Sequence, residues 1–270
     1  MNARPHKPVV LVIAGHDPVG GAGLQADIEA VAALGCHAAT AVTALTVQDT
    51  RNVSSFEVTA PELLRAQIEA VLGDLQPAAV KIGMIGSGDN ARVIARLLRQ
   101  HPHIPVVLDP VLVAGGGGSL AGNDLQQVLL TELLPLAAVL TPNGPEARTL
   151  AGSDVLADCA RRLAQHGAQH VLITGGHEPG DEIVTVLYGR DGELARHIHP
   201  RLPGNYHGSG CTLAAAVAAL LAQGAPVGRA VGEALAYTWQ TLDHAQRPGH
   251  GQAIPDRFFR LATTRPPYGN

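Results

Sequence analysis

Short aliphatic runs alternate with helix-length segments along most of this chain. The runs have the length and composition of buried strands, and they span Val9–Ala14, Cys36–Val42, Ala78–Met84, Pro105–Leu108, Ala137–Leu140 and His170–Ile173. Between them the apolar residues recur at helical spacing, as they do over Leu24–Leu34. Parallel strands need crossover connections of this kind, and the crossover helices cover both faces of the sheet. The alternation therefore predicts an α/β fold, a three-layer α/β/α arrangement around a mainly parallel central sheet.

The segments outside these runs complete the expected arrangement. Val53–Val58 is a candidate edge strand, and Ile183–Leu187 is expected to pair with Leu194–Ile198. The further helices expected are Pro61–Gly73, Asn90–Gln100, Leu125–Leu134, Val155–His166, Ala214–Gln223, Val227–Gln246 and Asp256–Leu261. Loops are expected over Val111–Leu120 and Thr141–Glu146. No repeat or linker divides the chain, so we expect one domain over residues 1–270 with flexible termini at 1–8 and 262–270.

Composition and charge narrow the class of protein. The chain has 270 residues and a formal net charge of −4, and its only lysines are Lys7 and Lys81, which argues against a nucleic-acid surface. No apolar run approaches the roughly 18 residues that span a bilayer, and Met1–Pro8 lacks an apolar signal region. Three widely spaced cysteines do not form a disulfide framework, and the histidines lack further metal ligands at useful spacing. We expect a cytoplasmic protein without membrane or nucleic-acid partners.

A glycine-containing loop, Pro203–Leu213, leads into an alanine-rich helical segment. Gly208 and Gly210 allow the backbone to turn tightly and to approach a ligand closely. The amides of residues 208–211 would then lie at a helix N-terminus, where unpaired N–H groups and the helix dipole favour an anion. Cys211 lies at the same positive end, which is expected to lower the pKa of its thiol and make it a candidate proton acceptor. The same residues also fit a glycine-rich loop that opens a core helix with a buried cysteine.

Polar side chains recur where the predicted strands end, and ligands of open α/β sheets bind beyond the carboxyl ends of the strands. The residues at these ends are Asp17, Gln48, Met84, Asp109, Asn143, Glu146, Thr174 to His177, and the loop of Cys211. Asp109, Asn143 and Glu146 offer the hard oxygen ligands that Mg²⁺ prefers. An anion site, a cation site and a proton acceptor together suggest phosphoryl transfer. Each of these residues taken singly also fits a helix cap or a turn.

Six motifs occur in order, and as an ordered set they are specific. They are Gly15-x-Asp-Pro-x-Gly-Gly-Ala-Gly-x-Gln-Ala-Asp27, Thr43–Thr50, Lys81–Met84, Thr141–Ala147, Gly175–His177 and His207–Thr212. With them the chain resembles the hydroxymethylpyrimidine/phosphomethylpyrimidine kinases of thiamine biosynthesis, within the ribokinase-like superfamily. The resemblance runs from about Val9 to Gly251, which leaves too little chain for the second biosynthetic enzyme that some relatives carry. It implies a ribokinase-like fold and ATP-dependent phosphorylation of 4-amino-5-hydroxymethyl-2-methylpyrimidine and then of its monophosphate to the diphosphate.

The resemblance also implies a role for each residue of the site. Cys211 would take the position of the catalytic base, and main-chain amides of Gly208, Ser209, Gly210 and Cys211 would hold the transferring phosphoryl group. The substrate would contact Asp17, Gly21, Gln48, Met84 and Val111. ATP would contact Asn143, Thr174, Gly176 and Thr212, and Mg²⁺ would be held by Asp109 and Glu146. The amide of Gln48 suits an aminopyrimidine but also fits a loop-stabilising bond, and Met84 also fits a core filler.

Two departures from the family pattern concern charge. Family members often carry lysine before the Gly-Gly-His loop and in the loop after the strand that ends at Asp109, where this chain has Thr174 and the Gly115 region. These two lysines would neutralise phosphates of ATP. We expect K⁺, a second Mg²⁺ or Arg201 to supply part of the missing positive charge. The resemblance leaves a pyridoxal kinase and a non-catalytic pyrimidine-binding protein of the same fold as alternatives. It also implies a homodimer, because ribokinase-like proteins often pair through their lids.

Overall fold

The computed structural model describes residues 6–112 and 123–262, which form a nine-stranded sheet in the order β3-β2-β1-β4-β5-β6-β7-β8-β9. The strands are β1 (Val9–His16), β2 (His37–Gln48), β3 (Val53–Val58), β4 (Ala79–Ile82), β5 (Val106–Leu108), β6 (Ala137–Leu140), β7 (Val171–Ile173), β8 (Glu182–Gly189) and β9 (Gly192–Pro200). Every pairing from β2 to β7 is parallel. Antiparallel strands are added at both ends, β3 at one and the β8–β9 hairpin at the other. The expected α/β fold with a mainly parallel sheet is confirmed.

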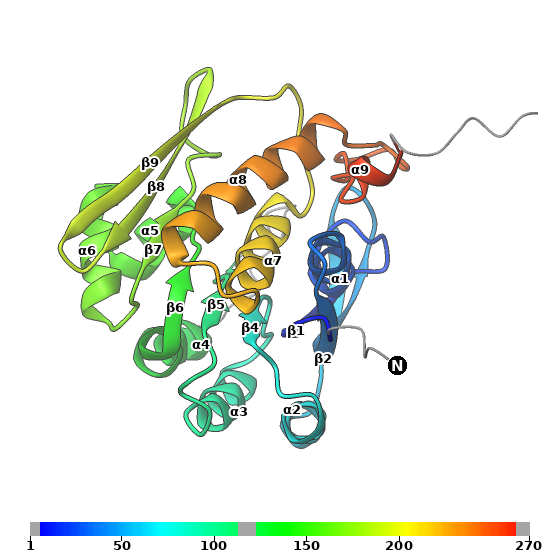
Figure 1. Cartoon of the computed structure of the whole chain (residues 1–270), viewed down its shortest axis with the longest axis vertical. Helices are drawn as coiled ribbons and strands as arrows, with labels where there is room; N and C mark the ends of the chain where they lie inside the picture. Colours follow the sequence, from blue (N-terminus) through cyan, green and yellow to red (C-terminus); the bar gives the residue numbers. More distant parts are fainter. Residues whose placement is uncertain (1–5, 113–122, 263–270) are drawn as a thin grey trace, which may run out of the picture.

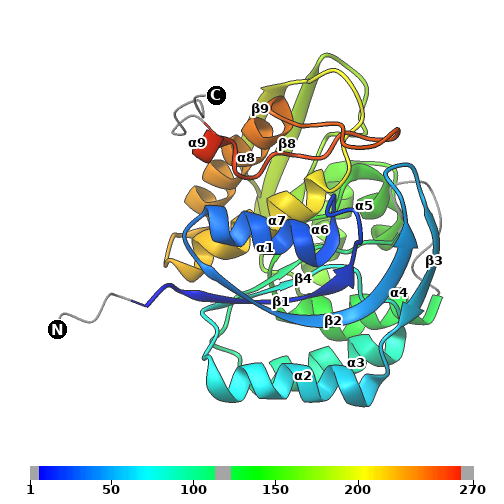
Figure 2. The ribbon, with the colours of Figure 1, turned by 90° about the vertical axis from the view of Figure 1, so that its right-hand side faces the viewer.

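Helices cover both faces of this sheet (Figure 1). They are α1 (Gly23–Ala33), α2 (Pro61–Asp74), α3 (Gly88–Leu98), α4 (Asn123–Val128), α5 (Gly144–Ala151), α6 (Leu156–Gln165), α7 (Ser209–Ala222), α8 (Val227–Asp243) and α9 (Phe259–Ala262). Figure 2 shows α1 and α7 on one side of β1 and β2, with α2 and α3 on the other side. The described residues thus share one sheet with two helical layers, which supports the proposal of a single domain.

The core explains why the short aliphatic runs fold in this way. In β1 the side chains of Leu11 and Ile13 pack with the layer of α2 and α3, while Val10 and Val12 pack with the layer of α1 and α7. All four are fully buried, as expected for a central parallel strand that is covered on both faces. The alanines of α7 let this helix lie between α1, α8 and the sheet, because small side chains permit close approach.

The structure corrects several predicted boundaries. The strand predicted to end at Val42 continues to Gln48, because its second half pairs with β3 in an antiparallel ribbon. The loop predicted over Thr141–Glu146 contains the start of α5, and the helix predicted over Leu125–Leu134 is α4 followed by a π turn and a 3₁₀ turn. At the N-terminus Pro8 is already tied to β2, since its carbonyl accepts from the amide of His37 at 2.9 Å. The rest of the predicted flexible termini, and the glycine-rich loop Ala114–Gly118, lie mostly or wholly outside the described residues.

Candidate active site

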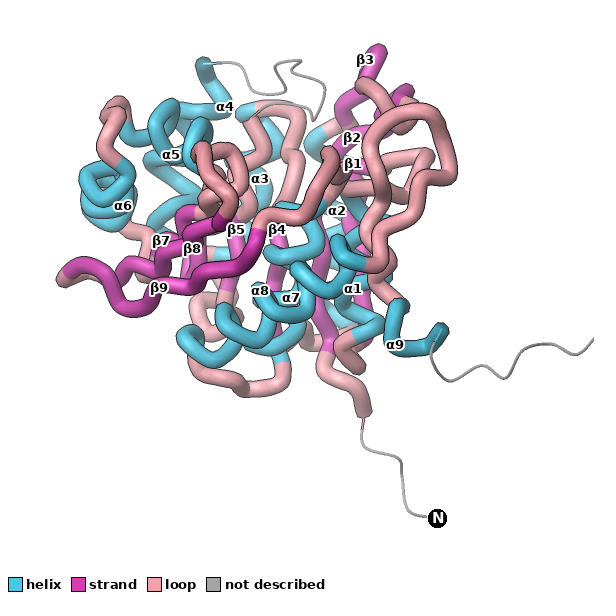
Figure 3. Tube along the Cα trace, turned by 90° about the horizontal axis from the view of Figure 1, so that it is seen from above, coloured by secondary structure: helices cyan, strands magenta, loops and turns pink. Residues whose placement is uncertain are grey.

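The predicted site residues lie on loops at the carboxyl edge of the parallel strands. Figure 3 views the molecule from above, where these loops gather. Asp17 follows β1, Met84 follows β4, Asp109 follows β5, Asn143 follows β6 and Thr174 follows β7. Carboxyl ends of parallel strands meet at one edge, so segments that are distant in the sequence contribute to one surface.

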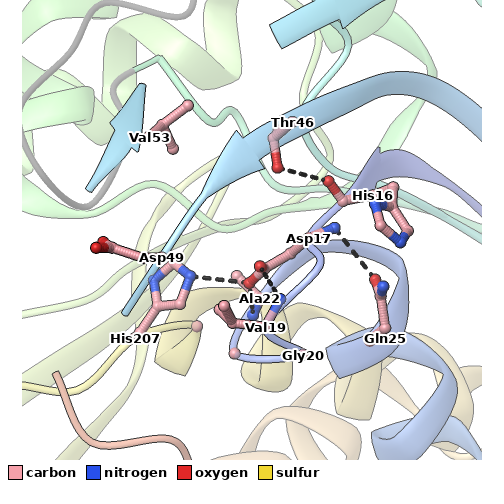
Figure 4. Close-up of polar contacts among 12 residues, drawn as sticks. His16, Asp17, Val19, Gly20, Ala22, Gln25, Thr46, Asp49, Val53 and His207 are labelled. Atoms are coloured by element: carbon pink, nitrogen blue, oxygen red, sulfur yellow. Dashed lines mark hydrogen bonds and ion pairs between the residues drawn. The ribbon is translucent and has the colours of Figure 1, made fainter. Parts of the chain in front are cut away.

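The glycine-rich loop after β1 is organised by the carboxylate of Asp17 (Figure 4). This carboxylate accepts hydrogen bonds from the amides of Val19 at 2.9 Å and Ala22 at 2.7 Å, and it lies 2.9 Å from the ring nitrogen Nε2 of His207. Burial acts to raise the pKa of Asp17, but hydrogen bonds from His207, Gln48 and the two amides lower it to about 2. Asp17 therefore stays ionised and ties its own loop to the loop before α7. Gln48 contributes to the lowered pKa of Asp17, which favours its loop-stabilising role, and its contact with substrate stays a prediction.

The first turn of α7 requires glycine for two steric reasons. Gly208 is the N-cap residue with φ +83°, in the left-handed region. A Cβ on Gly208 would lie 1.9 Å from the carbonyl oxygen of Gly21, and a Cβ on Gly21 would lie 2.2 Å from the ring of His207. The two glycine loops therefore touch through their backbones. Amides of Ser209, Gly210 and Cys211 lie in the first turn, where backbone donors have no intrahelical acceptor. The geometry fits the expected anion site.

Cys211 lies in this turn among charged groups. The amide of Gly23 and the carboxylate of Asp109 both act on its sulfur. Burial raises the pKa of Cys211 to about 12, and the negative charges of Asp109 and Asp27 add to this effect against the positive charge of Lys81. The prediction of a lowered thiol pKa is therefore wrong, because burial and these charges outweigh the field of one helix end. In the ligand-free protein the sulfur is a thiol that interacts with a carboxylate.

The ion pair of Lys81 and Asp27 lies near this thiol. Neither residue was predicted to have a role in the site. The two side chains are completely buried, and Lys81 Nζ lies 2.8 Å from Asp27 Oδ2. Burial acts to lower the pKa of Lys81, but the charge and hydrogen bond of Asp27, together with the acidic groups of Cys211 and Asp109, outweigh it, so the pKa rises and the ammonium stays charged. A lysine inside a strand as apolar as β4 was a usable signal, because lysine is almost never fully buried unless it is paired.

Asp109 and Glu146 form a carboxylate pair that fits a divalent cation. Burial raises the pKa of Asp109 to about 6, and burial with the charge of Asp109 raises the pKa of Glu146 to about 8. Asp109 Oδ2 is buried and has no hydrogen-bond partner among the described residues. In that part of the chain no group of three or more His, Cys, Asp and Glu side chains could hold a metal. Mg²⁺ is commonly held by one or two carboxylates with phosphate oxygens and waters, so the pair suits this ion.

Glu146 also caps α5 together with Asn143. The resemblance assigned Glu146 to Mg²⁺ and Asn143 to ATP, and this cap is a further role for both. The side-chain oxygen of Asn143 accepts from the amide of Glu146 at 2.9 Å, and Glu146 Oε2 accepts from the amide of Asn143 at 3.0 Å. This reciprocal capping box satisfies two donors at the start of the helix. Thr174 lies beside Asn143, and its amide donates to the carbonyl of Pro142 at 3.0 Å. The helix cap that the sequence analysis left open for these residues is thus formed.

A hollow of about 580 Å³ extends from the loop after β7 to the start of α7. Of the residues predicted for ATP and phosphate, Gly176 and Ser209 line it. Arg201 also lines it and donates to the carbonyls of Gly176 at 2.8 Å, Glu178 at 2.6 Å and Gly180 at 2.7 Å. These three bonds hold the loop in place and use donors on all three guanidinium nitrogens. Fewer donors therefore remain to bind the ATP phosphates in place of the missing lysines, as we expected of Arg201. The hydroxyl of Thr212 is buried and bonded inside the protein, so it has a structural role in place of the predicted contact with ATP.

Met84 and Val111 lie at the ends of neighbouring strands, and both are partly exposed. Met84 Sδ would lie 3.1 Å from a Cβ on Gly15, so its side chain packs against the first glycine loop. The amide of Val111 donates to the carbonyl of Asp109 at 2.9 Å, which places Val111 beside the carboxylate pair. Their contact with the substrate ring stays a prediction.

The fold and the site together define a phosphotransferase of the three-layer α/β/α class. A helix start whose free amides suit an anion, a carboxylate pair that suits Mg²⁺ and a hollow of about 580 Å³ lie at one sheet edge, the arrangement that phosphoryl transfer needs. The model of the family "Phosphomethylpyrimidine kinase" matches residues 17–256, so the chain belongs to this family.

Curated relatives agree with this assignment. The chain is 42% identical over 263 residues to a hydroxymethylpyrimidine/phosphomethylpyrimidine kinase of Rhizobium meliloti, covering 93% of this chain and 97% of the relative. It is 41% identical to a thiamine biosynthesis bifunctional protein of Geobacter sulfurreducens, covering 95% of this chain and 53% of that relative. The chain thus spans nearly all of the first protein and about half of the bifunctional one.

Solved structures of two kinds of kinase have the same fold. A phosphomethylpyrimidine kinase from Clostridium difficile aligns with a TM-score of 0.77 at 33% identity, covering 87% of this chain and all of that one. A pyridoxal kinase from Staphylococcus aureus, in complex with AMP-PCP and pyridoxal, aligns with a TM-score of 0.85 at 28% identity, covering 93% and 94%. Among the residues described here, no helix is long and apolar enough to cross a membrane.

Proposed function

We propose that this protein transfers the γ-phosphoryl group of ATP to the hydroxymethyl oxygen of 4-amino-5-hydroxymethyl-2-methylpyrimidine, and then to the monophosphate. The observation that carries the proposal is the meeting of Cys211, Asp109 and the first turn of α7 at the sheet edge. The pyrimidine as substrate is supported by the names of relatives such as the 42% identical hydroxymethylpyrimidine/phosphomethylpyrimidine kinase of Rhizobium meliloti.

Each group of the site has a separate task in this reaction. The amides of residues 209–211 would stabilise the charge on the transferring phosphoryl group. Because the thiol of Cys211 is protonated and interacts electrostatically with the neighbouring carboxylate of Asp109, we infer a proton relay. The sulfur accepts the hydroxymethyl proton as its own proton passes to the Asp109 carboxylate, so the thiol is unchanged and the carboxylate gains one proton. Mg²⁺ held by Asp109 and Glu146 would supply positive charge to the phosphates of ATP.

The substrate is tested by measuring ATP consumption with hydroxymethylpyrimidine, with its monophosphate and with pyridoxal. We expect turnover with both pyrimidines. Pyridoxal is a second candidate, because the pyridoxal kinase complex aligns with the higher TM-score of 0.85. Turnover with pyridoxal alone would replace the first proposal, and pyrimidine binding without any turnover would favour the non-catalytic alternative.

The cation site is tested by the change Glu146→Gln. Glutamine can still accept the hydrogen bond from the amide of Asn143, so the cap of α5 is retained while the carboxylate that would ligate Mg²⁺ is lost. We expect the Mg²⁺ concentration for half-maximal rate to rise at least about tenfold, because a carboxylate ligand is replaced by a neutral one. The measurement is a Mg²⁺ titration at saturating ATP, with Glu193→Gln on the exposed strand β9 as control. Equal titrations for the two variants would contradict a cation at Glu146.

The missing lysine is tested by Thr174→Lys. If the site lacks positive charge for the ATP phosphates, a lysine at the end of β7 should lower the KM for ATP about fivefold or more. Thr149→Lys places the same charge on the exposed side of α5 and serves as the matched control. Unchanged ATP affinity and turnover at Thr174→Lys would count against a charge deficit. K⁺ is then tested as the compensating ion by replacing it with Na⁺ in the assay.

We further propose a cytoplasmic homodimer that has no nucleic-acid partner. The projecting half of β2 exposes Leu45 and Val47, at 55% and 61%, which gives an apolar strand face for pairing with a second copy. The formal net charge of −4 supports the absence of a nucleic-acid partner. A molar mass measured in solution by light scattering tests the dimer.

A further inference from the structure

The segment 246–257, which we term the C-terminal strap, returns from α8 across the loops of the site. In Figure 2 it is the orange to red segment that reaches towards the turn between β2 and β3. The amide of Gln252 donates to the carbonyl of Thr50 at 2.9 Å, and the carbonyl of Ala253 accepts from the amide of His207 at 2.9 Å. A Cβ on Gly251 would lie 2.1 Å from the Thr50 carbonyl oxygen, so the strap presses closely on this turn. The strap therefore contacts both the β2–β3 turn and the loop before α7.

The strap ends in Arg257, whose guanidinium is buried between the two glycine loops. Only 2% of this residue is exposed. Nε donates to Thr212 Oγ1 at 2.9 Å, and Nη2 donates to the carbonyl of Gly21 at 2.5 Å. Nη1 donates to the carbonyl of Gly20 at 3.2 Å and lies 3.0 Å from a carboxylate oxygen of Glu29. One side chain thus bonds the loop after β1 and the first turn of α7 at the same time.

These bonds act on the two backbones that already touch. The hydroxyl of Thr212 donates to the Gly208 carbonyl at 2.8 Å, and the backbones of Gly208 and Gly21 leave no room for a Cβ. The carbonyl of Gly21 is therefore held between Gly208 and the guanidinium of Arg257. Loss of the guanidinium would remove the bonds that join two carbonyls to one group, that of Gly21 directly and that of Gly208 through Thr212.

We propose that Arg257 is a positioning residue, which sets the distance between the glycine loop after β1 and the phosphate-binding turn of α7. The proposal rests on the proposed function, since it concerns the two walls between which phosphoryl transfer takes place. Stability alone does not account for a buried arginine, because buried ion pairs can often be replaced by apolar side chains without loss. The side chain of Glu29 is 41% exposed, so water screens the ion pair that it forms with Arg257. The planar fork of arginine, with donors in several fixed directions, fits a role in geometry.

The test compares kcat and KM for Arg257→Met, Arg257→Lys and Glu29→Gln, each assayed well below its melting temperature. We expect Arg257→Met to lower kcat about thirtyfold or more, because small displacements of reacting groups have large effects on rate. Arg257→Lys keeps the charge without the fork, and we expect kcat to stay at least about tenfold low. Glu29→Gln leaves the fork in place, so kcat should stay within about twofold. The KM for ATP should change less than about threefold in all three.

Two further measurements separate positioning from general stability. Val231→Ala, in the buried face of α8, provides a variant with lowered melting temperature and unaltered loops, and its kcat should be retained. Hydrogen–deuterium exchange of the ligand-free protein should become faster in residues 19–23 and 209–212 of Arg257→Lys, and should be unchanged there in Val231→Ala. The exchange measurement needs no substrate, so it still decides the positioning role if the protein turns over none of the three candidate substrates.

Wild-type kcat in Arg257→Lys would show that charge rather than the fork matters and would overturn the proposal. A kcat loss in Val231→Ala equal to that of the Arg257 variants at equal melting temperature would do the same, as would unchanged exchange in both loops.

Discussion

Replacing Cys211 with alanine is expected to lower kcat by at least about a hundredfold, with a modest change in KM. The reason is the position of the thiol between the amide of Gly23, the carboxylate of Asp109 and the first turn of α7. A methyl group can neither accept the hydroxymethyl proton nor pass a proton to Asp109. The interactions that bind substrate and ATP come from other residues, so binding should persist. Steady-state kinetics with each pyrimidine measure both quantities.

Cys36 provides a matched control for this experiment. It is a buried cysteine whose thiol donates to the carbonyl of Ala219, near the opposite end of α7. Cys36→Ala removes a buried thiol that contacts the same helix from outside it, and its kcat should stay close to that of the wild type. If Cys211→Ala also retains kcat, the cysteine has only a structural role and the proposed relay fails.

The change Lys81→Met is expected to lower the free energy of unfolding by about 3–5 kcal/mol, because it leaves the charge of Asp27 buried without its partner. The two side chains have no exposed surface, and Asp27 Oδ1 has no other hydrogen-bond partner among the described residues. Urea denaturation at neutral pH measures the loss. The free energy of unfolding of an ordinary domain is about 5–15 kcal/mol, so the variant should lose a large part of its stability.

A double variant separates the stability effect of this pair from its effect on the site. Asp27→Leu with Lys81→Met replaces both charges by apolar side chains of similar size, and we expect it to recover most of the lost stability. Activity should stay low in the double variant, because the positive charge that Lys81 places near Cys211 and Asp109 is absent. A loss below about 1 kcal/mol in Lys81→Met alone, or full activity of the double variant, would contradict this account.

Local patterns in the sequence were sufficient for the fold class. The strands from β2 to β7 are aliphatic runs because both of their faces are buried, and burial of both faces is what the crossover helices require. The wrong boundaries lie at the start of α5 and at the end of β2, where one local pattern fits two kinds of structure. A loop was expected over Thr141–Glu146 with a cap or a turn at Asn143, whereas Asn143 and Glu146 have the three-residue spacing of a capping box and begin a helix. The outer half of β2 was not predicted as a strand because it pairs mainly with the antiparallel β3 and is not buried as an aliphatic run.

The site was predictable as a set of loop residues but not as a set of interactions. By itself, the sequence determined which residues follow the strands and which helix begins at a glycine, because both depend on neighbours along the chain. Only the tertiary structure decided that Cys211 has a raised pKa, that Lys81 pairs with Asp27 and that Arg257 joins two glycine loops. Charges and donors act through space, and their partners here are separated by tens to hundreds of residues of sequence, so no local pattern contains them.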